Sequence, residues 1–296
     1  MEWTACYRRL SVTLGSDFLP PSGWTALGSC ANEFLICQPY MIASFFQSLE
    51  SENVAYLLIS GQATVLYGAA TFSEDIDIWI RPTQANANAV LAALRAREAR
   101  YYKLTPPPNE ANLRRGHGFH FVIPDDPEIY LDVMGCPPRV GDYDAAMSSA
   151  QVIDTSWGRI PTVGLKDLVA MKSTQRLGDY PIIGQLVLRY LEEQPDPTPA
   201  DLQWAINNVY TIEDLDALLS SFPDLPWRSD YEVLQAYVAN RRSDYPPPDL
   251  ADAVEASLFV RLNQARKDDR AYWVDIIDEL RDFRASEELM PAGQPV

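Results

Sequence analysis

The sequence has 296 residues, 47% of them hydrophobic, and a formal net charge of −17 at pH 7. This length suits one large domain or two ordinary ones. We expect no membrane span, because the chain lacks a run of eighteen apolar residues, and no secretory signal, because the first ten residues lack an apolar core. The acidic charge argues against a broad nucleic-acid-binding surface, although it does not exclude a local one. The four cysteines have neither metal-binding nor disulfide spacing, so we expect a cytoplasmic protein with reduced thiols.

The first predicted helix runs from Pro39 to Glu50, where apolar residues recur at helical spacing. Residues 1–38 precede it as an N-terminal extension with a loop at 20–23, for which we expect a packing or lid role.

The stretch from residue 55 to residue 80 joins an apolar strand to a small-residue turn at Ser60-Gly61, a short helix and a second strand. Residues 75–80 alternate strictly, which is the period of a strand and places Asp75 and Asp77 on one face. Two like charges so close repel each other unless a cation lies between them. The sequence therefore predicts either a solvated strand edge or a site for hard cations, most often magnesium.

A helix is predicted over residues 84–100, capped by Thr83, and Pro106-Pro107-Pro108 ends the region in a loop. Residues 95–115 are the only clearly basic part of the chain. Their cations are Arg95, Arg97, Arg100, Lys103, Arg114 and Arg115. This region is either a solvated helix face or a track for a triphosphate or a nucleic-acid acceptor.

Two further strands are predicted within residues 116–135. His117 and His120 are the only histidines, and their spacing on an extended segment places them on opposite faces, which favours strand and substrate-pocket roles over metal ligation. Asp132 interrupts the apolar run 129–134, and a charge there is costly unless it is paired with a cation or coordinated to one.

Residues 158–180 read as a short strand followed by a helix that begins near Leu165. On this helix Lys172, Arg176 and Asp179 stand at i, i+4 and i+7, so the pattern predicts that all three share one face. Such a face is either an ordinary solvated surface or a clamp for a polyanion, with lysine as a point charge and arginine as a fork.

The proline-rich segment 193–199 is the best linker in the chain. Beyond it the pattern is helical only, with a capping box at 211–214 and a long periodic segment that opens at Asp249. We therefore predict an α/β core over residues 39–193 with a small mixed β-sheet, an all-helical domain over 200–288, and a disordered tail over 289–296.

The turn Ser60-Gly61, the spacing to Asp75-x-Asp77, and the later Asp132 together resemble the signature of the nucleotidyltransferase superfamily, which has the DNA polymerase β-like fold. The chain is most similar to the AbiEii-type branch, some members of which are toxins of toxin–antitoxin or phage-abortive systems. The resemblance covers residues 40–192 and includes the Lys-x-x-x-Arg-x-x-Asp pattern at 172–179. Three departures concern the turn and its neighbourhood: Ser60 stands where the family has glycine, and Thr71 and Ser73 stand where the branch has arginine and threonine. A fourth is Ile182, at a place where a second acidic residue often follows.

The resemblance implies an enzyme that transfers a nucleotidyl group from an NTP such as ATP to an acceptor hydroxyl, with Asp75, Asp77 and Asp132 holding two magnesium ions. It also implies that Ser60 and Gly61 contact phosphate oxygens. Lys172 and Arg176 would bind the triphosphate, and Asp179 would orient one of these cations or contact the sugar.

The acceptor stays open between RNA, a protein hydroxyl and a small molecule such as an aminoglycoside. A different class of function is also open: a catalytically inactive, nucleotide-binding member of the fold that acts as a sensor or binds a protein partner such as an antitoxin. A purely structural interaction protein built on the C-terminal helices is the third alternative.

Overall fold

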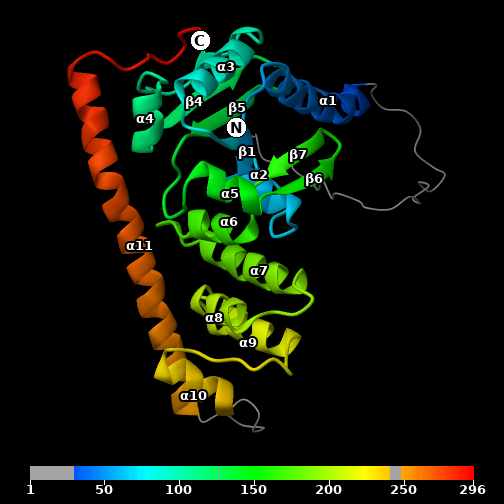
Figure 1. Ribbon diagram of the computed structural model, residues 1–296, viewed down its shortest axis with the longest axis vertical. Helices are drawn as coiled ribbons and strands as arrows, with labels where there is room; N and C mark the ends of the chain where they lie inside the picture. The colour runs from blue at the N-terminus through cyan, green and yellow to red at the C-terminus, as the bar shows by residue number, and fades with distance from the viewer. Residues whose placement is uncertain (1–29, 126, 241–247) are drawn as a thin grey trace, which may run out of the picture.

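The computed structural model describes residues 30–125, 127–240 and 248–296, with the side chains of the first helix described from Met41 on. Its centre is one seven-stranded mixed sheet in the order β3-β4-β5-β2-β1-β7-β6. The strands are β1 (Tyr56–Ile59), β2 (Ile76–Ile80), β3 (Arg100–Tyr101), β4 (Gly118–Ile123), β5 (Ile129–Met134), β6 (Gln151–Thr155) and β7 (Gly158–Thr162). The predicted α/β class with a mixed sheet and a helical C-terminal part is confirmed (Figure 1).

The register of the central strands sets the positions of the carboxylates. Strand β2 pairs antiparallel with β1 and parallel with β5, and Asp77 stands directly beside Asp132. On the other side of β5, strand β4 pairs antiparallel so that His120 stands beside Asp132. Three neighbouring strands thus present Asp77, Asp132 and His120 in one row on one face of the sheet.

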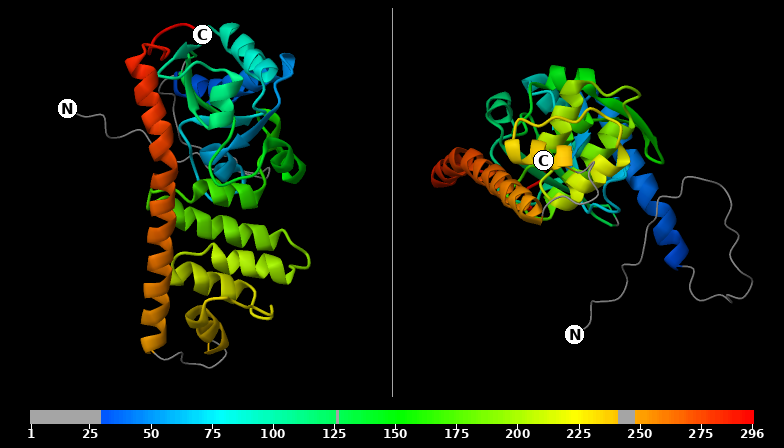
Figure 2. Two further views of the ribbon diagram at one scale, coloured as in Figure 1. Left: turned by 60° about the vertical axis from the view of Figure 1, so that its left-hand side comes forward. Right: turned by 90° about the horizontal axis from the view of Figure 1, so that it is seen from below.

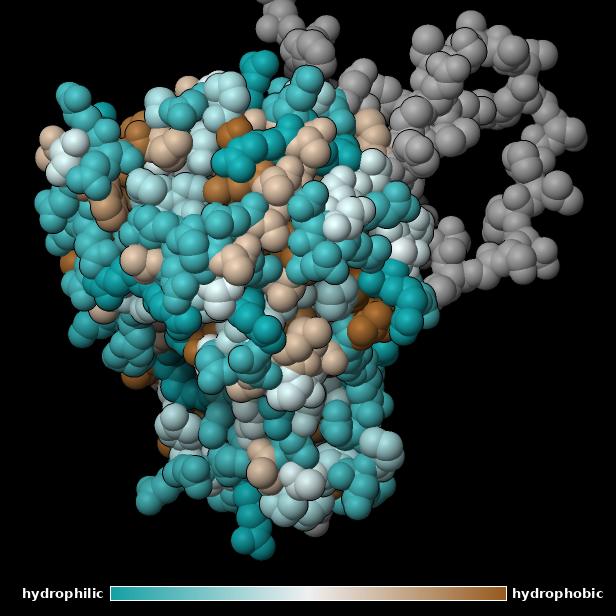
Figure 3. Space-filling model, turned by 45° about the horizontal axis from the view of Figure 1, so that its top comes forward, coloured by the Kyte–Doolittle hydropathy of each residue, from teal (hydrophilic) through white to brown (hydrophobic). Residues whose placement is uncertain are grey.

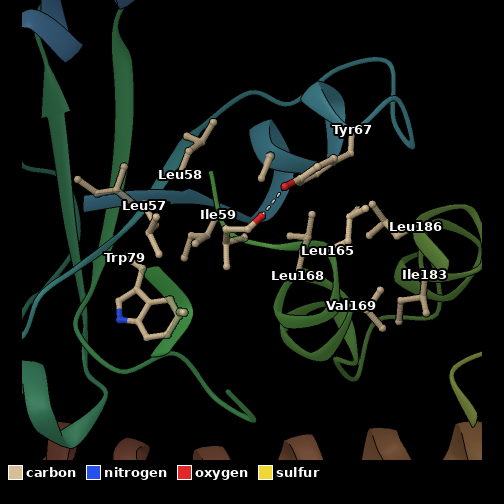
Figure 4. Close-up of a cluster of buried hydrophobic side chains, with 14 of the residues drawn as sticks. Leu57, Leu58, Ile59, Tyr67, Trp79, Leu165, Leu168, Val169, Ile183 and Leu186 are labelled. Carbon is tan, nitrogen blue, oxygen red and sulfur yellow. Dashed lines mark hydrogen bonds between the residues drawn. The ribbon is translucent and has the colours of Figure 1, made fainter. Parts of the chain in front are cut away.

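The opposite face and the interior of the molecule are apolar. In β4 alternate residues are buried, as the sequence pattern predicted, and Ile76, Ile78 and Ile80 of β2 are buried as well. Alternate residues of β5 are also buried, although the sequence there reads as an apolar run interrupted by Asp132. Figure 4 shows how Leu57 to Ile59 of β1 extend this core toward α6 (Leu165–Lys172) and α7 (Asp179–Glu192). The Tyr67 hydroxyl donates to the Val163 carbonyl oxygen across 2.8 Å and satisfies a buried polar group at this junction.

Helices cover the sheet and extend away from it. Besides α6 and α7, the helices of the described residues are α1 (Cys30–Ser51), α2 (Ser60–Leu66), α3 (Gln84–Arg95), α4 (Glu110–Arg115), α5 (Tyr143–Ser149), α8 (Pro199–Asn207), α9 (Ile212–Ser221), α10 (Glu232–Asn240) and α11 (Pro248–Ala285). Helices α7 to α10 are stacked below the sheet, and α11 runs back along one side of the molecule from α10 to the level of the sheet (Figures 1 and 2). Among the described residues, no helix is both long and apolar enough to cross a membrane. The face in Figure 3 is mainly hydrophilic, with apolar residues scattered over it.

Buried polar contacts attach α11 to the core. Asp269 accepts hydrogen bonds from the Arg139 guanidinium at 2.6 Å and from the Gln175 backbone N–H at 2.9 Å. Near its C-terminal end, Glu279 lies 3.0 Å from Nε2 of the fully buried His117 and also accepts from Arg115. The helix that the sequence assigned to a separate C-terminal unit therefore also packs against the sheet region.

Three predicted boundaries are wrong. Helix α1 begins at Cys30 rather than Pro39, and the proposed lid or packing role of residues 1–29 lies outside the described residues. Helix α3 ends at Arg95 instead of continuing to residue 100, because the chain turns through Glu98 at φ +56° and enters β3.

The third wrong prediction is the disordered tail over residues 289–296. Residues 290–296 instead form backbone hydrogen bonds with residues 99–105, among them Met290 N–H to the Thr105 carbonyl at 2.7 Å and Val296 N–H to the Ala99 carbonyl at 3.0 Å. These bonds occupy the otherwise free edge of the sheet beside β3.

Candidate active site

Three carboxylates meet on the open face of the sheet. Asp75 immediately precedes β2, Asp77 lies inside it, and Asp132 lies beside Asp77 on β5. One carboxylate oxygen from each lies within 4.8 Å of the others, and all three side chains are half-buried. The structure thus brings together the three acidic residues that the sequence singled out.

This arrangement is electrostatically unfavourable without a cation. Burial, followed by the charges of Asp75 and Asp132, raises the pKa of Asp77 to about 7, although a hydrogen bond from Ser60 and the charge of Lys172 lower it. Three neighbouring carboxylates, one of which resists ionisation because of its burial and its acidic neighbours, form a donor set that suits a hard divalent cation. The residues present therefore fit magnesium.

The pKa of Asp132 is shifted in the opposite direction from that of Asp77. Its burial would raise its pKa, but hydrogen bonds and charge from His120, together with the Tyr102 hydroxyl, lower the pKa of Asp132 below its usual value. Nδ1 of His120 lies 2.7 Å from Oδ1 of Asp132, and the Tyr102 hydroxyl donates to the same oxygen across 2.9 Å. Neither of these two bonds uses Oδ2, so Asp132 is held charged with one oxygen directed elsewhere.

Tyr102 was missed by sequence reasoning, and His120 was named without a position relative to the site. Tyr102 follows β3, and its ring makes edge contacts with His120 and with Tyr130. A signal for His120 was present in the sequence: pairing residues 118–123 with 129–134 as a hairpin places His120 opposite Asp132. Tyr102 had no such signal, because β3 is only two residues long.

His117 is not part of this site. It precedes β4, is fully buried, and contacts Glu279 of α11. The two histidines therefore have separate roles, and within the described residues neither belongs to a cluster with a second histidine.

The turn at Ser60-Gly61 is next to the carboxylates. Ser60 has φ +56°, in the left-handed region that disfavours residues with a Cβ, and its side chain hydrogen-bonds Asp77. A Cβ on Gly61 would lie 2.1 Å from Oγ of Ser73, and that hydroxyl in turn lies 3.3 Å from Oδ1 of Asp75. Ser60 and Gly61 therefore allow the start of α2 to approach both carboxylates closely.

The single helix predicted to carry Lys172, Arg176 and Asp179 is wrong. Helix α6 ends at Lys172, residues 173–178 form a non-helical connection, and α7 begins at Asp179. The three residues thus occupy three different local structures.

Two of these three residues still meet. Nζ of Lys172 lies 3.4 Å from Oδ1 of the buried Asp179, which also accepts from the Thr174 hydroxyl. The charge of Lys172 reaches Asp77, because it lowers the pKa of that carboxyl. Arg176 is exposed in the connection between α6 and α7. A lysine beside the triad is thus kept in place by a buried aspartate, with an exposed arginine nearby.

The basic region 95–115 is partly neutralised. Arg97 pairs with Asp125 at 2.6 Å, Arg114 pairs with Glu110 at 2.8 Å, and Arg115 pairs with Glu279. Lys103 differs, because its ammonium group lies over the Tyr102 ring, 4.5 Å from the ring centre. A continuous basic track is therefore not formed by these side chains, although Lys103 lies beside the candidate site.

Comparisons with known proteins place nucleotidyltransferases among the structural neighbours. No protein-family model matches the sequence, and no curated protein is significantly similar to it. Among solved structures, an antigenic nucleotidyltransferase-like protein from Paracoccidioides brasiliensis is 17% identical, with a TM-score of 0.38 over 63% of this chain and 89% of its own. A candidate nucleotidyltransferase from H. pylori is 14% identical, with a TM-score of 0.38 over 83% and 98%.

A third neighbour is ANT(2")-Ia in complex with adenylyl-2"-tobramycin, which is 15% identical with a TM-score of 0.33 over 70% of this chain and 99% of its own. At these identities and scores the alignments establish neither family membership nor activity for this chain. The AbiEii-type branch is not confirmed by any of the three. The functional argument therefore rests on the geometry of the carboxylates and their neighbours.

Proposed function

We propose that this protein is a nucleotidyltransferase that moves an NMP from an NTP to an acceptor hydroxyl. The observation that carries the proposal is the convergence of Asp75, Asp77 and Asp132 beside Ser60 and Lys172. Asp75, Asp77 and Asp132 would hold magnesium, with two ions expected. When bound, the metal supplies charge neutralisation on the phosphates and lowers the pKa of the attacking hydroxyl.

The reaction forms a bond between the acceptor oxygen and the α-phosphorus and breaks the bond from that phosphorus to pyrophosphate. The acceptor proton passes to Asp132, which His120 and Tyr102 keep ionised and fixed through Oδ1. These two neighbours limit the positions of Oδ2, so that the proton acceptor is in place before the substrate arrives.

The cationic residues of the proposed site are Lys172 and Arg176. Lys172 would balance charge on the triphosphate and on the leaving pyrophosphate, and Asp179 and Thr174 would hold Lys172 in place. Arg176, exposed beside it, would bind the outer phosphates as a fork. Ser60 and Gly61, at the start of α2 beside the carboxylates, would contact phosphate oxygens.

The acceptor class and the biological setting are two further parts of the proposal. RNA, a protein hydroxyl and a small molecule remain the three acceptor classes, and a role in a toxin–antitoxin or defence system with an antitoxin-like partner follows only from the sequence resemblance. A cytoplasmic location is part of the same proposal. The ion pairs in residues 95–115 leave less free positive charge for a nucleic-acid acceptor than the sequence suggested.

The test is transfer of label from each α-labelled NTP in the presence of magnesium, with and without total cellular RNA. We expect wild-type protein to produce a labelled RNA, protein or small-molecule product, and Asp77→Asn to produce none. Asp154→Asn is the matched control, because Asp154 is 87% exposed on β6 and pairs only weakly, at 3.5 Å, with Arg159, which is 78% exposed. Equal labelling by wild type and Asp77→Asn would contradict the proposal.

A nucleotide-binding protein without transferase activity is the second candidate. One observation favours it: Lys172 is engaged by Asp179 in an ion pair whose two side chains are only 14% and 11% exposed. Magnesium-dependent binding of an NTP without transfer of label to any acceptor would support this candidate over the first.

A further inference from the structure

The open face of the sheet carries a second row of side chains beside the row that contains Asp132. The register of β5, β4 and β3 places Tyr130 beside Val122 and Val122 beside Arg100. Extending the register of β2 and β5 by one residue places Asp75 beside Tyr130. Since residues on one face are two apart along a strand, the two rows are separated by about 7 Å. The second row therefore adjoins the carboxylates, and its side chains beyond Asp75 have no role in the proposed transfer step.

Tyr130 presents an aromatic ring in this second row and is 39% exposed. Its hydroxyl donates to Oε2 of Glu128 across 2.9 Å, and its ring centre lies 5.2 Å from that of Tyr102, with the two planes at 79°. Tyr102 is itself fixed by its hydrogen bond to Asp132. Two contacts thus hold an exposed ring two residues from the proposed proton acceptor. Aromatic rings on an open sheet face are platforms on which nucleic-acid bases stack.

Two exposed cations accompany Tyr130. Arg100 lies in the same row, two strands away across the sheet. The Lys103 ammonium lies over the Tyr102 ring, and its charge contributes to the lowered pKa of Asp132. Within the described part of the chain neither cation takes part in an ion pair, unlike three arginines of the same basic region. The charges of these two cations match one or two phosphate groups.

We propose that Tyr130 stacks against the base of a nucleotide that provides the acceptor hydroxyl, and that Arg100 and Lys103 bind the phosphate of this nucleotide. The inference rests on the proposed nucleotidyl transfer and chooses among its acceptor classes. The hydroxyl oxygen of the nucleotide forms the bond to the α-phosphorus, pyrophosphate leaves, and the proton passes to Asp132. The terminal nucleotide of an RNA and a free nucleotide share this chemistry, so either can be the source.

The order of the strands separates this surface from the turn proposed to bind the triphosphate. Strands β5, β4 and β3 lie on one side of β2, and β1, which leads into Ser60 and α2, lies on the other. The proposed proton acceptor Asp132 lies on β5, two residues after Tyr130. A nucleotide stacked on Tyr130 therefore approaches from the side of Asp132, while the triphosphate is bound from the side of Ser60.

Charge and shape favour a nucleotide over the other acceptor classes. An aminosugar with several positive charges would be repelled by Arg100 and Lys103. A serine or threonine hydroxyl of a protein would leave the Tyr130 ring and both cations without a contact. A long nucleic-acid tract needs more than two cations and is disfavoured by the net charge of −17, whereas the acid that contacts Tyr130, Glu128, is engaged by the Tyr130 hydroxyl. A single terminal or free nucleotide is thus the occupant that uses the ring and both cations.

The experiment compares wild type with Tyr130→Leu in the transfer of label from an α-labelled NTP to two pairs of acceptors. The first pair is a short RNA and the same RNA with an abasic 3′-terminal residue, and the second is adenosine monophosphate and ribose 5-phosphate. We expect Tyr130→Leu to raise the KM for the base-containing acceptor roughly tenfold to hundredfold and to leave the KM for NTP unchanged. Removing the base should raise the wild-type KM as much, but the KM of Tyr130→Leu little further, because the variant has no stacking left to lose. The better acceptor of the two pairs identifies the source of the nucleotide.

Tyr231→Leu is the matched control, because Tyr231 is 43% exposed but lies just before α10, away from the sheet (Figure 1). It should leave both KM values unchanged. Tyr130→Phe keeps the ring and loses only the bond to Glu128, so it should restore a KM for the acceptor near that of wild type. Arg100→Gln should raise the KM for the acceptor severalfold at low salt, whereas Arg159→Gln, which removes a 78% exposed cation from β7, should not.

Binding of a fluorescent short RNA and of a fluorescent nucleotide, measured by anisotropy without NTP, separates this inference from the proposed function. Label transfer that requires Asp77 but reaches only proteins or aminosugars would overturn the inference and leave the proposed function intact. A KM for NTP that rises in Tyr130→Leu would overturn it too, since the ring would then serve the incoming nucleotide. If wild type transfers no label, the proposed function fails, and equal binding of both probes by Tyr130→Leu and Tyr130→Phe would overturn the inference as well.

Discussion

Asp77 carries a carboxyl group that the fold disfavours in its charged form. Its pKa of about 7 lies above the value near 3.8 expected in the unfolded chain, because of burial and then the charges of Asp75 and Asp132. Between these two pH values the folded state binds more protons than the unfolded state, so the free energy of unfolding falls as pH rises from about 4 to about 7 and is flat above that.

The substitution Asp77→Asn should remove this fall in the free energy of unfolding between pH 4 and pH 7. We expect the variant to be more stable than wild type at pH 8 in the absence of divalent ions, by about 4 kcal/mol for a pKa raised from 3.8 to about 7, and to differ little from it at pH 4. Urea unfolding at both pH values measures the difference. Magnesium should raise the Tm of wild type but not that of the variant, and a wild-type stability that instead rises between pH 4 and 7 relative to Asp77→Asn would contradict the electrostatic argument.

Ser60 combines a strained backbone with a useful hydroxyl. Its φ of +56° costs a residue with a Cβ about 1 kcal/mol, whereas its side chain hydrogen-bonds Asp77. Ser60→Gly and Ser60→Ala both remove the hydroxyl, but only glycine relieves the strain.

The glycine variant should therefore be more stable than the alanine variant by about 1 kcal/mol in chemical denaturation. Both should bind nucleotide more weakly than wild type if the hydroxyl acts in the site. Equal stability of the two variants would show that the left-handed conformation of residue 60 is not retained in solution.

The connection between α6 and α7 depends on an element that is distant in sequence. The Gln175 backbone is held on both sides by α11, with its N–H donating to Asp269 at 2.9 Å and its carbonyl accepting from Arg266 at 2.9 Å. Arg139 also donates to the carbonyls of Ala170 and Met171, at the end of α6, while it pairs with Asp269. Asp269 is thus the shared acceptor that joins three segments.

Asp269→Ala would leave Arg139 and the Gln175 N–H without their buried partner. Asp269 is only 2% exposed, and breaking such a buried pair costs about 3–5 kcal/mol. We expect this loss in urea unfolding, together with faster hydrogen exchange at residues 173–178 and weaker nucleotide binding through displaced Lys172.

The neighbouring Asp268→Ala is the control, because Asp268 is exposed and accepts only from Gln264 on its own helix. It should change stability by less than about 0.5 kcal/mol. Similar effects of the two substitutions would mean that Asp269 does not hold the connection.

The same contacts explain what the sequence could and could not predict. Strand alternation placed Asp75 and Asp77 on one face, and an acid inside an apolar run drew attention to Asp132, because both signals are local. The break after Lys172 had no local signal: residues 165–180 keep a helical pattern, and the helix is ended by Arg139 and by α11, whose residues are far away in sequence. Tyr102 was missed for a related reason, since a two-residue strand has no period to detect.

At the scale of the whole molecule, the tail and α11 connect the last residues to the candidate site. Residues 290–296 pair with residues 99–105 through five backbone hydrogen bonds that include Gly293 N–H to the Tyr101 carbonyl and Tyr101 N–H to the Gln294 carbonyl. Tyr101 immediately precedes Tyr102, whose hydroxyl holds Asp132. The segment that positions Tyr102 is therefore fixed on one side by β4 and on the other by the tail.

A variant that ends at Glu288 should lose these bonds and expose the edge of the sheet at β3. With about 1 kcal/mol for each backbone bond, we expect a loss of about 3–5 kcal/mol in unfolding free energy and a tendency to associate through the free edge. Hydrogen exchange at residues 99–105 should become faster, while exchange in α7 and α9 should change little, because the tail does not touch them.

Ala292→Ser is the control for that truncation, since residue 292 is exposed and the substitution retains every backbone bond of the tail. It should behave as wild type in both measurements. If the truncated variant also releases Tyr102 from Asp132, the proton acceptor loses one of its two fixed contacts, and nucleotidyl transfer should fall in kcat more than in the KM for NTP, because the cations at Lys172 and Arg176 are unaffected. An unchanged exchange rate at residues 99–105 would instead show that β4 alone holds Tyr102, and that the tail serves only to cover the sheet edge.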